Sequence, residues 1–479
     1  MILSLLLSIL IPQLIAFVLI LGLWPGELSL RSNLLLKSCL AAGVGLGILS
    51  CVYFLQLSLF GPSRKGLAAT QLALLICAAA ILFYRLKSTK NVPPNEPVRE
   101  PPSRSRLQLI LSILFIAAFV SAVVAFIFIS LRQPHGEWDA WAVYNMKARF
   151  LFRAGENWRD LYSEQMSWSG PDYPLLVPAT IAACWLLMGR ETVIVPALVA
   201  LIFTFATIGL VARSVSLFRG RTQGLLAGLV LACTPYLIMH GANQYSDIPI
   251  GFFFSATIVL LALRDKFADG GHKFLVLAGL AGGLSAWTKN EGLLFIAAIV
   301  ISRFVVMGRT GGLKNYLRQM KFFAAGLAPT LSVVLFFKAT VAARNGVLFA
   351  TEGPSLWAKL LEFSRYITIL DGVVTNSLSF GNWTVSVVPL LIFYLLLLGA
   401  GVEDKEKASV ITLLVVLGIM LLGYSMVYVL SPRDVYWHLV NSINRLFSQL
   451  WPSFVFVYFL IVRTPEKALD RRNAIPLPS

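Results

Sequence analysis

The sequence is poor in charged residues. Asp, Glu, Lys and Arg together make up 13% of its 479 residues, whereas 57% are hydrophobic and the mean hydropathy is +0.77. A soluble protein of this length needs a far more polar surface. The composition therefore predicts an integral membrane protein with one embedded domain.

Features that would define other classes are also missing. There is no Walker loop or dinucleotide fingerprint, which makes a soluble nucleotide-sugar donor less natural. We find neither a short-period repeat nor two matching halves, and the N-terminus lacks the basic region of a cleavable signal peptide. The five cysteines lie in apolar segments without metal-type spacing, so we interpret them as small buried hydrophobic residues. They are Cys39, Cys51, Cys77, Cys184 and Cys233.

Long apolar runs predict an all-α, polytopic fold with about thirteen transmembrane helices. One further apolar segment, 174–189, is short and has Pro174 and Pro178 in its first turns. We interpret it as a re-entrant or interfacial helix on the outer side, which needs protein or water around its free backbone groups. The thirteen runs are 2–24, 38–60, 68–84, 107–131, 192–216, 223–240, 248–264, 274–288, 291–307, 322–343, 383–400, 409–430 and 447–463.

The net charge of +17 is distributed unevenly between the two sides of the predicted membrane protein. When the connecting segments are sorted alternately, one side receives 25 of the 40 Lys and Arg but 10 of the 23 Asp and Glu. The positive-inside rule makes this side cytoplasmic, together with the C-terminus. The basic excess therefore indicates topology and some attraction to lipid headgroups, and we do not expect nucleic acid as a partner.

A basic segment rich in proline divides the chain, and we interpret it as a cytoplasmic linker. The functional core is expected to begin directly after it. The four expected parts are three N-terminal transmembrane helices in 1–86, the linker in 87–106, a catalytic membrane core in 107–463 and a cytoplasmic tail in 464–479.

The stretch HGEWDAWAVYNMKARF places acids, bases and tryptophans at the mouth of the fourth predicted span. Asp139 lies between two tryptophans, Glu137 is two residues before it, and Lys147 and Arg149 follow. An acid kept partly dry and close to bases is a candidate for proton transfer. A plain interfacial anchor is the alternative interpretation.

Two further polar turns lie on the same predicted side. Asp247 in YSDIPIGFFF starts a span, either as a simple helix N-cap or as a site residue. Lys289 in TKNEG either snorkels to the lipid headgroups or points at a phosphate, with Glu291 as its local partner.

The segment SPRDVYWHLVNSINR predicts a helix with one narrow polar face. At 100° per residue, Asp434, His438, Asn441 and Arg445 fall within a single stripe. An amphipathic interfacial helix with a solvated face is one interpretation. In the other, His438 and Arg445 grip an anion and Asp434 orients His438 by an i,i+4 contact.

Four motifs together resemble GT-C membrane glycosyltransferases, in particular the family related to protein O-mannosyltransferases and aminoarabinose transferases. They are EWDAWAVYNMKARFLFRAG followed by GPDYPLLVP, then YSDIPIGFFF, GGLSAWTKNEGLLF and DVYWHLVNSINRLFSQLWP, in the order of the bacterial members. The resemblance covers roughly 107–463 and leaves the first three predicted spans outside.

The resemblance implies a polyprenyl-phosphate-linked sugar as donor and transfer on the non-cytoplasmic face. It implies that Asp139 is catalytic and that Asp247 matches a second acid, which shapes the site. Many relatives have another acid directly after the first, where this sequence has Ala140. This leaves open whether a divalent cation binds and whether Glu137 shares the catalytic role with Asp139.

These inferences predict inverting sugar transfer, with Asp139 as general base. Lys289, His438 and Arg445 are the expected stabilisers of the departing phosphate, with Lys147 and Arg149 as second choices. The acceptor is an unidentified glycan, lipid or protein, and the expected location is a bacterial inner membrane with the site facing the periplasm. A secondary transporter is the main alternative, followed by a lipid-carrier flippase or ligase.

Overall fold

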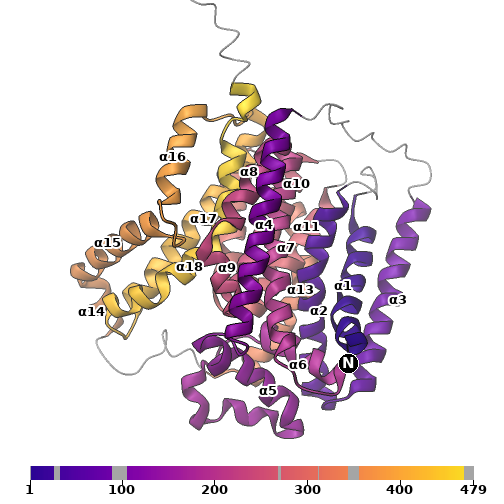
Figure 1. Ribbon diagram of the computed structural model, residues 1–479. Helices are drawn as coiled ribbons and strands as arrows, with labels where there is room; N and C mark the ends of the chain where they lie inside the picture. Colours follow the sequence, from indigo (N-terminus) through magenta and orange to yellow (C-terminus); the bar gives the residue numbers. More distant parts are fainter. Residues whose placement is uncertain are drawn as a thin grey trace, which may run out of the picture.

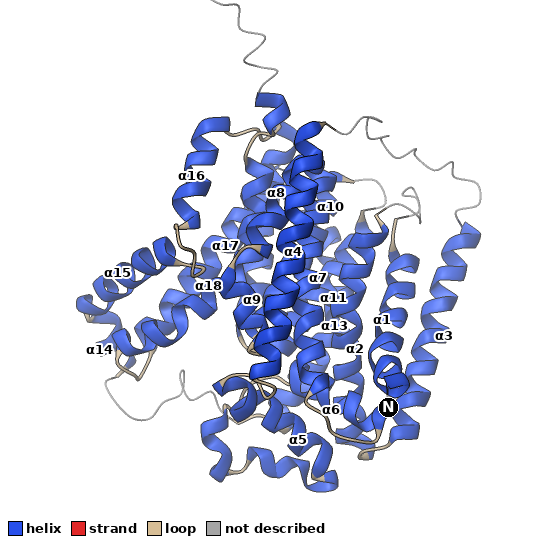
Figure 2. Ribbon diagram, in the orientation of Figure 1, coloured by secondary structure: helices blue, strands red, loops and turns tan. Residues whose placement is uncertain are grey.

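The computed structural model describes residues 2–25, 33–88, 105–267, 271–310, 312–343 and 355–468. Over these residues the chain forms helices joined by loops, with one isolated β-bridge between Ala400 and Val462 (Figure 2). Most of the predicted linker, residues 344–354 and most of the predicted tail lie outside the described residues. The described part of the chain is therefore an all-α polytopic membrane protein, as the sequence predicted.

Each of the thirteen predicted spans contains at least one helix. Eight helices are long and apolar enough to cross a membrane in the described residues, or nine when the bent pair α8 and α9 counts as one span. The long helices α1 to α4 are Ile2–Leu23, Leu34–Phe60, Arg64–Ser88 and Arg106–Arg132; α7 is Ile194–Arg219, α8 Arg221–Ala232, α9 Pro235–Ala242, α10 Asp247–Lys266, α11 His272–Thr288, α12 Glu291–Thr310, α13 Gly312–Thr340, α16 Val387–Leu398, α17 Asp404–Leu430 and α18 Val435–Ile461.

Two predicted spans differ from the structure. The run 223–240 is broken into α8 and α9, which meet at 57°. Pro235 starts α9, and Thr234 before it is extended, because the ring of a proline disfavours helical backbone at the preceding residue. The run 383–400 contains only the 12-residue α16, which is shorter than the roughly 20 residues that a membrane crossing requires.

Nearly all of α10 is buried, whereas α3 and α4 expose most of their residues at the outside of the bundle (Figure 1). The helix α10 packs against α7, α11, α17 and α18, so its first residue, Asp247, is surrounded by other helices. The position of α10 therefore determines which polar side chains of the neighbouring helices can reach Asp247.

One end of the bundle carries the beginning of α4, the end of α3 and the end of α18 (Figure 1). The beginning of α8 lies with them, because Thr222 is hydrogen bonded to Gln108 of α4 and Gln223 donates to Val462 after α18. Segments that the charge pattern assigned to one side of the membrane thus share one end of the bundle.

The opposite end holds the loop 133–175, which contains short helices (Figure 1). They are the π-helical turn η1 Ala140–Tyr144, α5 Asn145–Arg153, and the 3₁₀ turns η2 Gly155–Tyr162 and η3 Glu164–Ser169. The short apolar segment forms α6, Leu176–Met188, which is almost wholly buried among α1, α2, α5 and α7. Protein therefore surrounds this helix, as a re-entrant or interfacial element requires.

The helices α14, Leu356–Leu361, and α15, Phe363–Ser379, extend sideways from the bundle beside the first half of α18 (Figure 1). A small apolar cluster of Ile369, Tyr428 and Leu439 joins this arm to α17. The second half of α18 then enters the bundle next to α10, which carries side chains of α18 towards Asp247.

Candidate functional site

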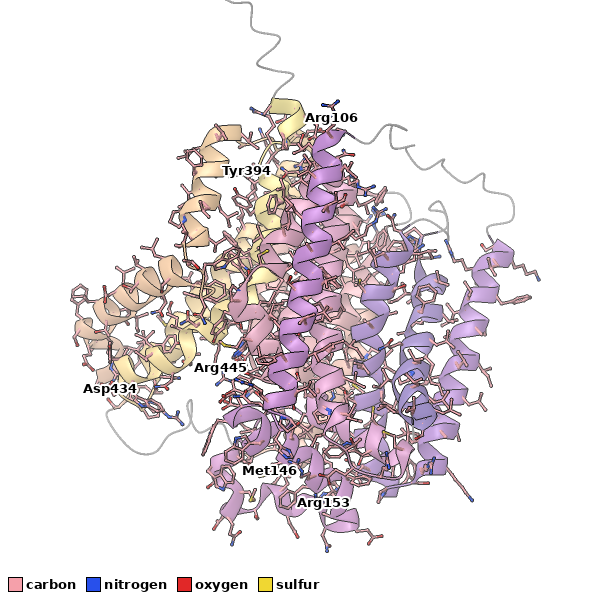
Figure 3. All side chains as sticks on the ribbon, in the orientation of Figure 1. Arg106, Met146, Arg153, Tyr394, Asp434 and Arg445 are labelled. Atoms are coloured by element: carbon pink, nitrogen blue, oxygen red, sulfur yellow. The ribbon has the colours of Figure 1, made fainter. Side chains whose placement is uncertain are left out.

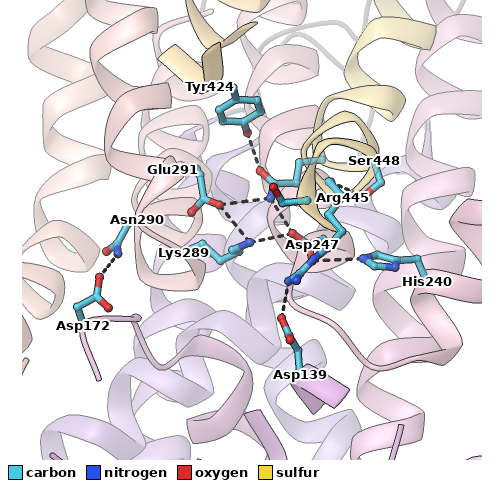
Figure 4. A network of polar contacts seen from close by, with 12 residues as sticks. Asp139, Asp172, His240, Asp247, Lys289, Asn290, Glu291, Tyr424, Arg445 and Ser448 are labelled. Carbon is cyan, nitrogen blue, oxygen red and sulfur yellow. Dashed lines mark hydrogen bonds and ion pairs between the residues drawn. The ribbon is translucent and has the colours of Figure 1, made fainter. Parts of the chain in front are cut away.

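Asp247 is fully buried, and its carboxylate accepts hydrogen bonds from four side chains (Figure 4). Its Oδ1 lies 2.8 Å from Nζ of Lys289 and 2.7 Å from Nε2 of Gln449. Its Oδ2 lies 3.1 Å from Nη2 of Arg445 and 3.3 Å from Nε2 of His240. A buried carboxylate is stable only when it is paired and hydrogen bonded, and Asp247 meets both conditions. The interpretation of Asp247 as a mere N-cap is wrong, because its oxygens bind side chains and Ser246 precedes the helix as its cap residue.

Arg445 joins two acids that are 108 positions apart in the chain. Its Nη2 atom lies 2.6 Å from Oδ2 of Asp139 as well as 3.1 Å from Oδ2 of Asp247. The guanidinium also stands 4.9 Å from the centre of the Tyr245 ring, a cation–π distance. The expected convergence of Asp139 with the polar face of α18 is therefore present in the structure (Figure 4).

Asp139 is partly exposed, with 22% of its side chain accessible. It directly precedes the π-helical turn η1, and single π-turns occur frequently at functional sites. Asp139 has one ion-pair partner within the described residues, whereas Asp247 is enclosed by four donors. A ligand can therefore approach Asp139 but not the fully buried Asp247.

Lys289 and Glu291 come from the tight turn between α11 and α12. Nζ of Lys289 lies 3.1 Å from Oε1 of Glu291, and Lys289 is only 6% exposed. The snorkelling interpretation of Lys289 is therefore wrong. Gly292 permits this turn, since a Cβ atom there would lie 2.2 Å from the carbonyl carbon of Ser285. We call the residues Asp139, His240, Asp247, Lys289, Glu291, Arg445 and Gln449 the acid–base network.

A second polar cluster connects the outer loop to the same turn. Nδ2 of Asn290 donates to Oδ2 of Asp172 over 2.7 Å, and Nζ of Lys338 donates to Oδ1 of Asn290 over 2.7 Å. Asp172 precedes α6, and Lys338 ends α13. The turn that carries Lys289 is therefore held from both sides.

Two predicted site residues lie apart from the acid–base network. Asp434 caps α18 by accepting a hydrogen bond from the backbone N of Trp437 at 2.8 Å. His438 is paired through Nδ1 with Oγ of Ser431 at 2.9 Å. The predicted Asp434–His438 contact is wrong, because each side chain binds a different partner. Figure 3 shows Asp434 at the tip of the sideways arm and Arg445 at the bundle.

Glu137, Lys147 and Arg149 are also not brought to the network. Oε1 of Glu137 accepts from Gln133 at 3.1 Å, and Nε of Arg149 is paired with Glu191 at 2.8 Å. Nζ of Lys147 is buried and donates to the carbonyl oxygen of Gly170 at 2.6 Å. Burial lowers the pKa of Lys147 to about 7. These side chains hold the outer loop together.

Sequence reasoning missed several residues around Asp247. His240 ends the predicted span 223–240, and Gln449 and Tyr424 lie inside two others. Tyr424 donates its hydroxyl to Oε1 of Gln449 at 2.6 Å, which orients the amide towards Asp247. The available signal was the presence of ionisable or amide groups within apolar runs, since such groups usually face the interior of a bundle.

The residues present do not fit a divalent cation. Within the described ranges there is no group of three or more His, Cys, Asp or Glu side chains arranged to hold a metal ion. The two nearest carboxylates, Asp139 and Asp247, share Arg445, and Asp247 is also paired with Lys289. The negative charges that a metal ion would neutralise are therefore already paired with positively charged side chains of the protein.

A cavity of about 480 Å³ lies at the other end of the bundle, between α7, α10, α17 and α18. Its charged lining is already paired internally, as in the 2.8 Å ion pair between Arg219 and Glu406. No member of the acid–base network lines it. We therefore identify the candidate site by the network of side chains and not by the size of the cavity.

The fold and the buried network define a polytopic helical membrane protein with an acid–base site at one end of its bundle. Residues 172–337 match the sequence model of a family described as dolichyl-phosphate-mannose-protein mannosyltransferase. No curated protein and no solved structure matches the chain. The matched segment covers about a third of the chain and includes Asp172, His240, Asp247, Lys289 and Glu291. This similarity supports the GT-C resemblance and indicates a membrane glycosyltransferase.

Proposed function

We propose that the protein transfers a sugar from a polyprenyl-phosphate donor to a hydroxyl group of an acceptor, with inversion at the anomeric carbon. The observation that carries this proposal is the position of Arg445, which contacts both the accessible acid, Asp139, and the buried acid, Asp247. This arrangement places a proton acceptor and a cation side by side, which are the two groups that transfer from a phosphate-linked sugar requires.

Asp139 is the general base in this proposal. It accepts the proton of the acceptor hydroxyl while the oxygen attacks C1 of the sugar, and the bond from C1 to the phosphate oxygen breaks through an oxocarbenium-like state. Its partial exposure leaves room for an acceptor, whereas the enclosed Asp247 has none.

Arg445 and Lys289 stabilise the departing lipid phosphate, on which negative charge increases during the reaction. Arginine suits this task because its planar guanidinium offers several donors in a fixed geometry. Asp247 is a positioning residue, since it holds both cations and fixes where they point. The side chains of the network hold one another in place, and such preorganisation is the usual source of electrostatic catalysis.

The proposed compartment follows from the charge pattern. In Figure 3, Arg445 lies away from Arg106, the first residue of α4, and towards the end of the bundle that carries Met146 and Arg153. We assign this end to the periplasmic face of a bacterial inner membrane, with the C-terminus in the cytoplasm. The acceptor is then a glycan, a lipid or a protein that is exposed on that face.

One observation favours a secondary transporter as the second candidate. The bent pair α8 and α9 is a broken span, and it brings His240 to the buried Asp247. Broken helices with ionisable residues are typical of transporter substrate sites. Uptake of labelled sugar into proteoliposomes, without release of polyprenyl phosphate, would support this alternative.

The test uses purified protein in lipid bilayers, a panel of polyprenyl-phosphate sugars, and a membrane extract that supplies acceptors. Release of free polyprenyl phosphate is measured for the wild type and for Asp139→Asn. We expect one donor to be consumed, and loss of the general base to lower the rate by about 10²- to 10⁴-fold.

Asp160→Asn is the matched control, because it makes the same chemical change at an exposed position of the same outer loop. It is expected to react like the wild type. Undiminished turnover by Asp139→Asn would remove Asp139 as the base, and failure of every donor in the panel would contradict the donor class.

A further inference from the structure

A groove of about 310 Å³ lies between α1 and α3, two of the helices outside the resemblance to glycosyltransferases. These helices stand at the side of the bundle, and α3 is its outermost helix there (Figure 1). Most of the groove is apolar, and exposed leucines form its rim, so it is open to the hydrocarbon of a bilayer. Its apolar lining comprises Leu7, Ile11, Leu14, Leu72, Leu75 and Leu187.

Two polar side chains of α3 line this mostly apolar groove, to which α1 also contributes Ser4 and Ser8. Arg64 is the first residue of α3, is exposed, and has no hydrogen bond or ion pair within the described residues. Its Nη1 atom stands 3.4 Å from the position that a Cβ of Gly189 would take, which places the cation at the end of α6. A free cation at the mouth of an apolar groove suits the phosphate of a lipid.

Gln71 supplies the second observation. It is only 5% exposed, and its Nε2 is buried without a hydrogen-bond partner in the described part of the chain. A buried donor without a partner destabilises the folded protein. Because Gln71 lines the groove, a ligand that occupies the groove can provide the missing acceptor.

The spacing of the two residues distinguishes among lipids. Arg64 and Gln71 are seven positions apart and share one face of α3, about 10 Å apart along the helix axis. A glycerophospholipid has acceptors at two such depths, a phosphate at the surface and ester carbonyl oxygens below it. A polyprenyl phosphate has only hydrocarbon below its phosphate and would leave Nε2 of Gln71 unpaired.

We propose that this groove binds one glycerophospholipid, with its phosphate on Arg64, an ester carbonyl on Gln71 and an acyl chain along the leucines. The lipid contacts α1, α3 and the end of α6, and so connects the N-terminal helices to the element that follows Asp172. This inference is independent of the proposed sugar transfer, since neither Arg64 nor Gln71 belongs to the acid–base network.

The test is native mass spectrometry of delipidated full-length protein titrated with dioleoyl phosphatidylglycerol. The wild type is expected to retain one lipid. Arg64→Ala should weaken binding about tenfold through loss of a charge-assisted hydrogen bond, and Gln71→Leu about fivefold through loss of a neutral one. Ala68→Trp, which fills the groove, should abolish this binding. Lys65→Ala is the control, because it removes a neighbouring exposed cation that does not line the groove.

Unfolding midpoints measured in the same detergent show whether each variant is folded. Wild-type affinity in both Arg64→Ala and Gln71→Leu would overturn the proposal. Equal affinity for a polyprenyl phosphate, unaffected by Gln71→Leu, would overturn the choice of lipid. Displacement of the phospholipid by inorganic phosphate alone would reduce the site to an anion site and would also contradict the proposal.

Discussion

The Nη2 atom of Arg445 lies 2.6 Å from Oδ2 of Asp139. The two residues belong to the first outer loop and to the last long helix, so folding of almost the whole membrane core is needed to bring them together. Both partners of this contact are partly exposed, with 23% of the Arg445 side chain and 22% of the Asp139 side chain accessible, whereas Lys289, which pairs with Asp247 and Glu291, is 7% accessible.

Replacement of Arg445 by lysine tests the need for a guanidinium at this position. We expect Arg445→Lys to retain binding to the buried Asp247 and to lose the contact with Asp139, since an ammonium group cannot bridge both in the same way. The turnover number should fall about 100-fold, the effect of removing one preorganised donor. Steady-state kinetics with the donor measure this loss, with Arg433→Lys on the exposed start of the same segment as control. Equal losses in both variants would contradict a specific role for Arg445.

A double-mutant cycle measures the coupling of Asp247 and Lys289. Each of Asp247→Asn and Lys289→Met should lower the free energy of unfolding by about 3 to 5 kcal/mol, because each leaves a buried charge without its partner. The double variant should lose less than the sum, with a coupling of about 2 kcal/mol. Unfolding in mixed micelles gives these values. The exposed pair Asp404–Lys407, at 2.7 Å, should show a coupling near zero in the parallel cycle.

Lys147 predicts a specific dependence of stability on pH. Its folded-state pKa of about 7 lies below the ordinary value of 10.5, so between these values the unfolded chain holds a proton that the folded protein has released. Stability contributed by this group must therefore rise with pH from about 7 to 10, with a slope of at most about 1.4 kcal/mol per pH unit. Lys147→Met should flatten this rise in unfolding measurements, whereas Lys65→Met at an exposed position should keep it. An unchanged slope in Lys147→Met would contradict the assignment.

Gly326 allows α11 and α13 to approach closely. A Cβ atom at this position would lie 1.8 Å from the carbonyl oxygen of Val276, so Gly326→Ala must push the helices apart. We expect the free energy of unfolding to fall by about 1 to 3 kcal/mol. Gly418→Ala in α17 has open space around it and should be neutral or stabilising by up to about 1 kcal/mol. Comparable destabilisation in both would indicate that backbone propensity, and not the close contact, determines the effect.

Much of the fold could be predicted because apolar length is a strong signal. Each of the thirteen predicted runs contains at least one helix, and Asp139, Asp247, Lys289 and Arg445 do meet at one end of the bundle. Their convergence was predicted from positions at the ends of spans on one side of the membrane. Their individual roles in catalysis stay a prediction.

The polar stripe of α18 shows what a helical projection omits. Asp434 and Arg445 share a face, but 11 residues separate them, which corresponds to about 16 Å along the axis. The angular position on a helical projection gives the direction in which a side chain points but not its position along the helix axis. Asp434 therefore ends at the tip of the arm while Arg445 reaches the network (Figure 3).

His240, Asn290 and Gln449 were missed for a different reason. Each is a single polar residue in an apolar run or in a tight turn. One such residue changes the mean hydropathy of the surrounding segment very little. The partners of Asn290 and Gln449, Asp172 and Asp247, lie more than 100 residues away in sequence, so only the packing of several helices shows why these two residues are there. His240 reaches Asp247, seven residues further on, across the turn between α9 and α10.

The glycines of α2 have a consequence for how the chain is made. Gly43 has no room for a Cβ atom because the ring of Phe252 fills that space, and a Cβ atom at Gly47 would lie 2.8 Å from the side chain of Leu284. Ribosomes complete α2 long before they reach α10 and α11, and domains begin to fold from the N-terminus during synthesis. After α2 inserts into the bilayer, its glycine positions must therefore face lipid until α10 and α11 are made. Assembly of the core has to expel that lipid before Phe252 can take its place.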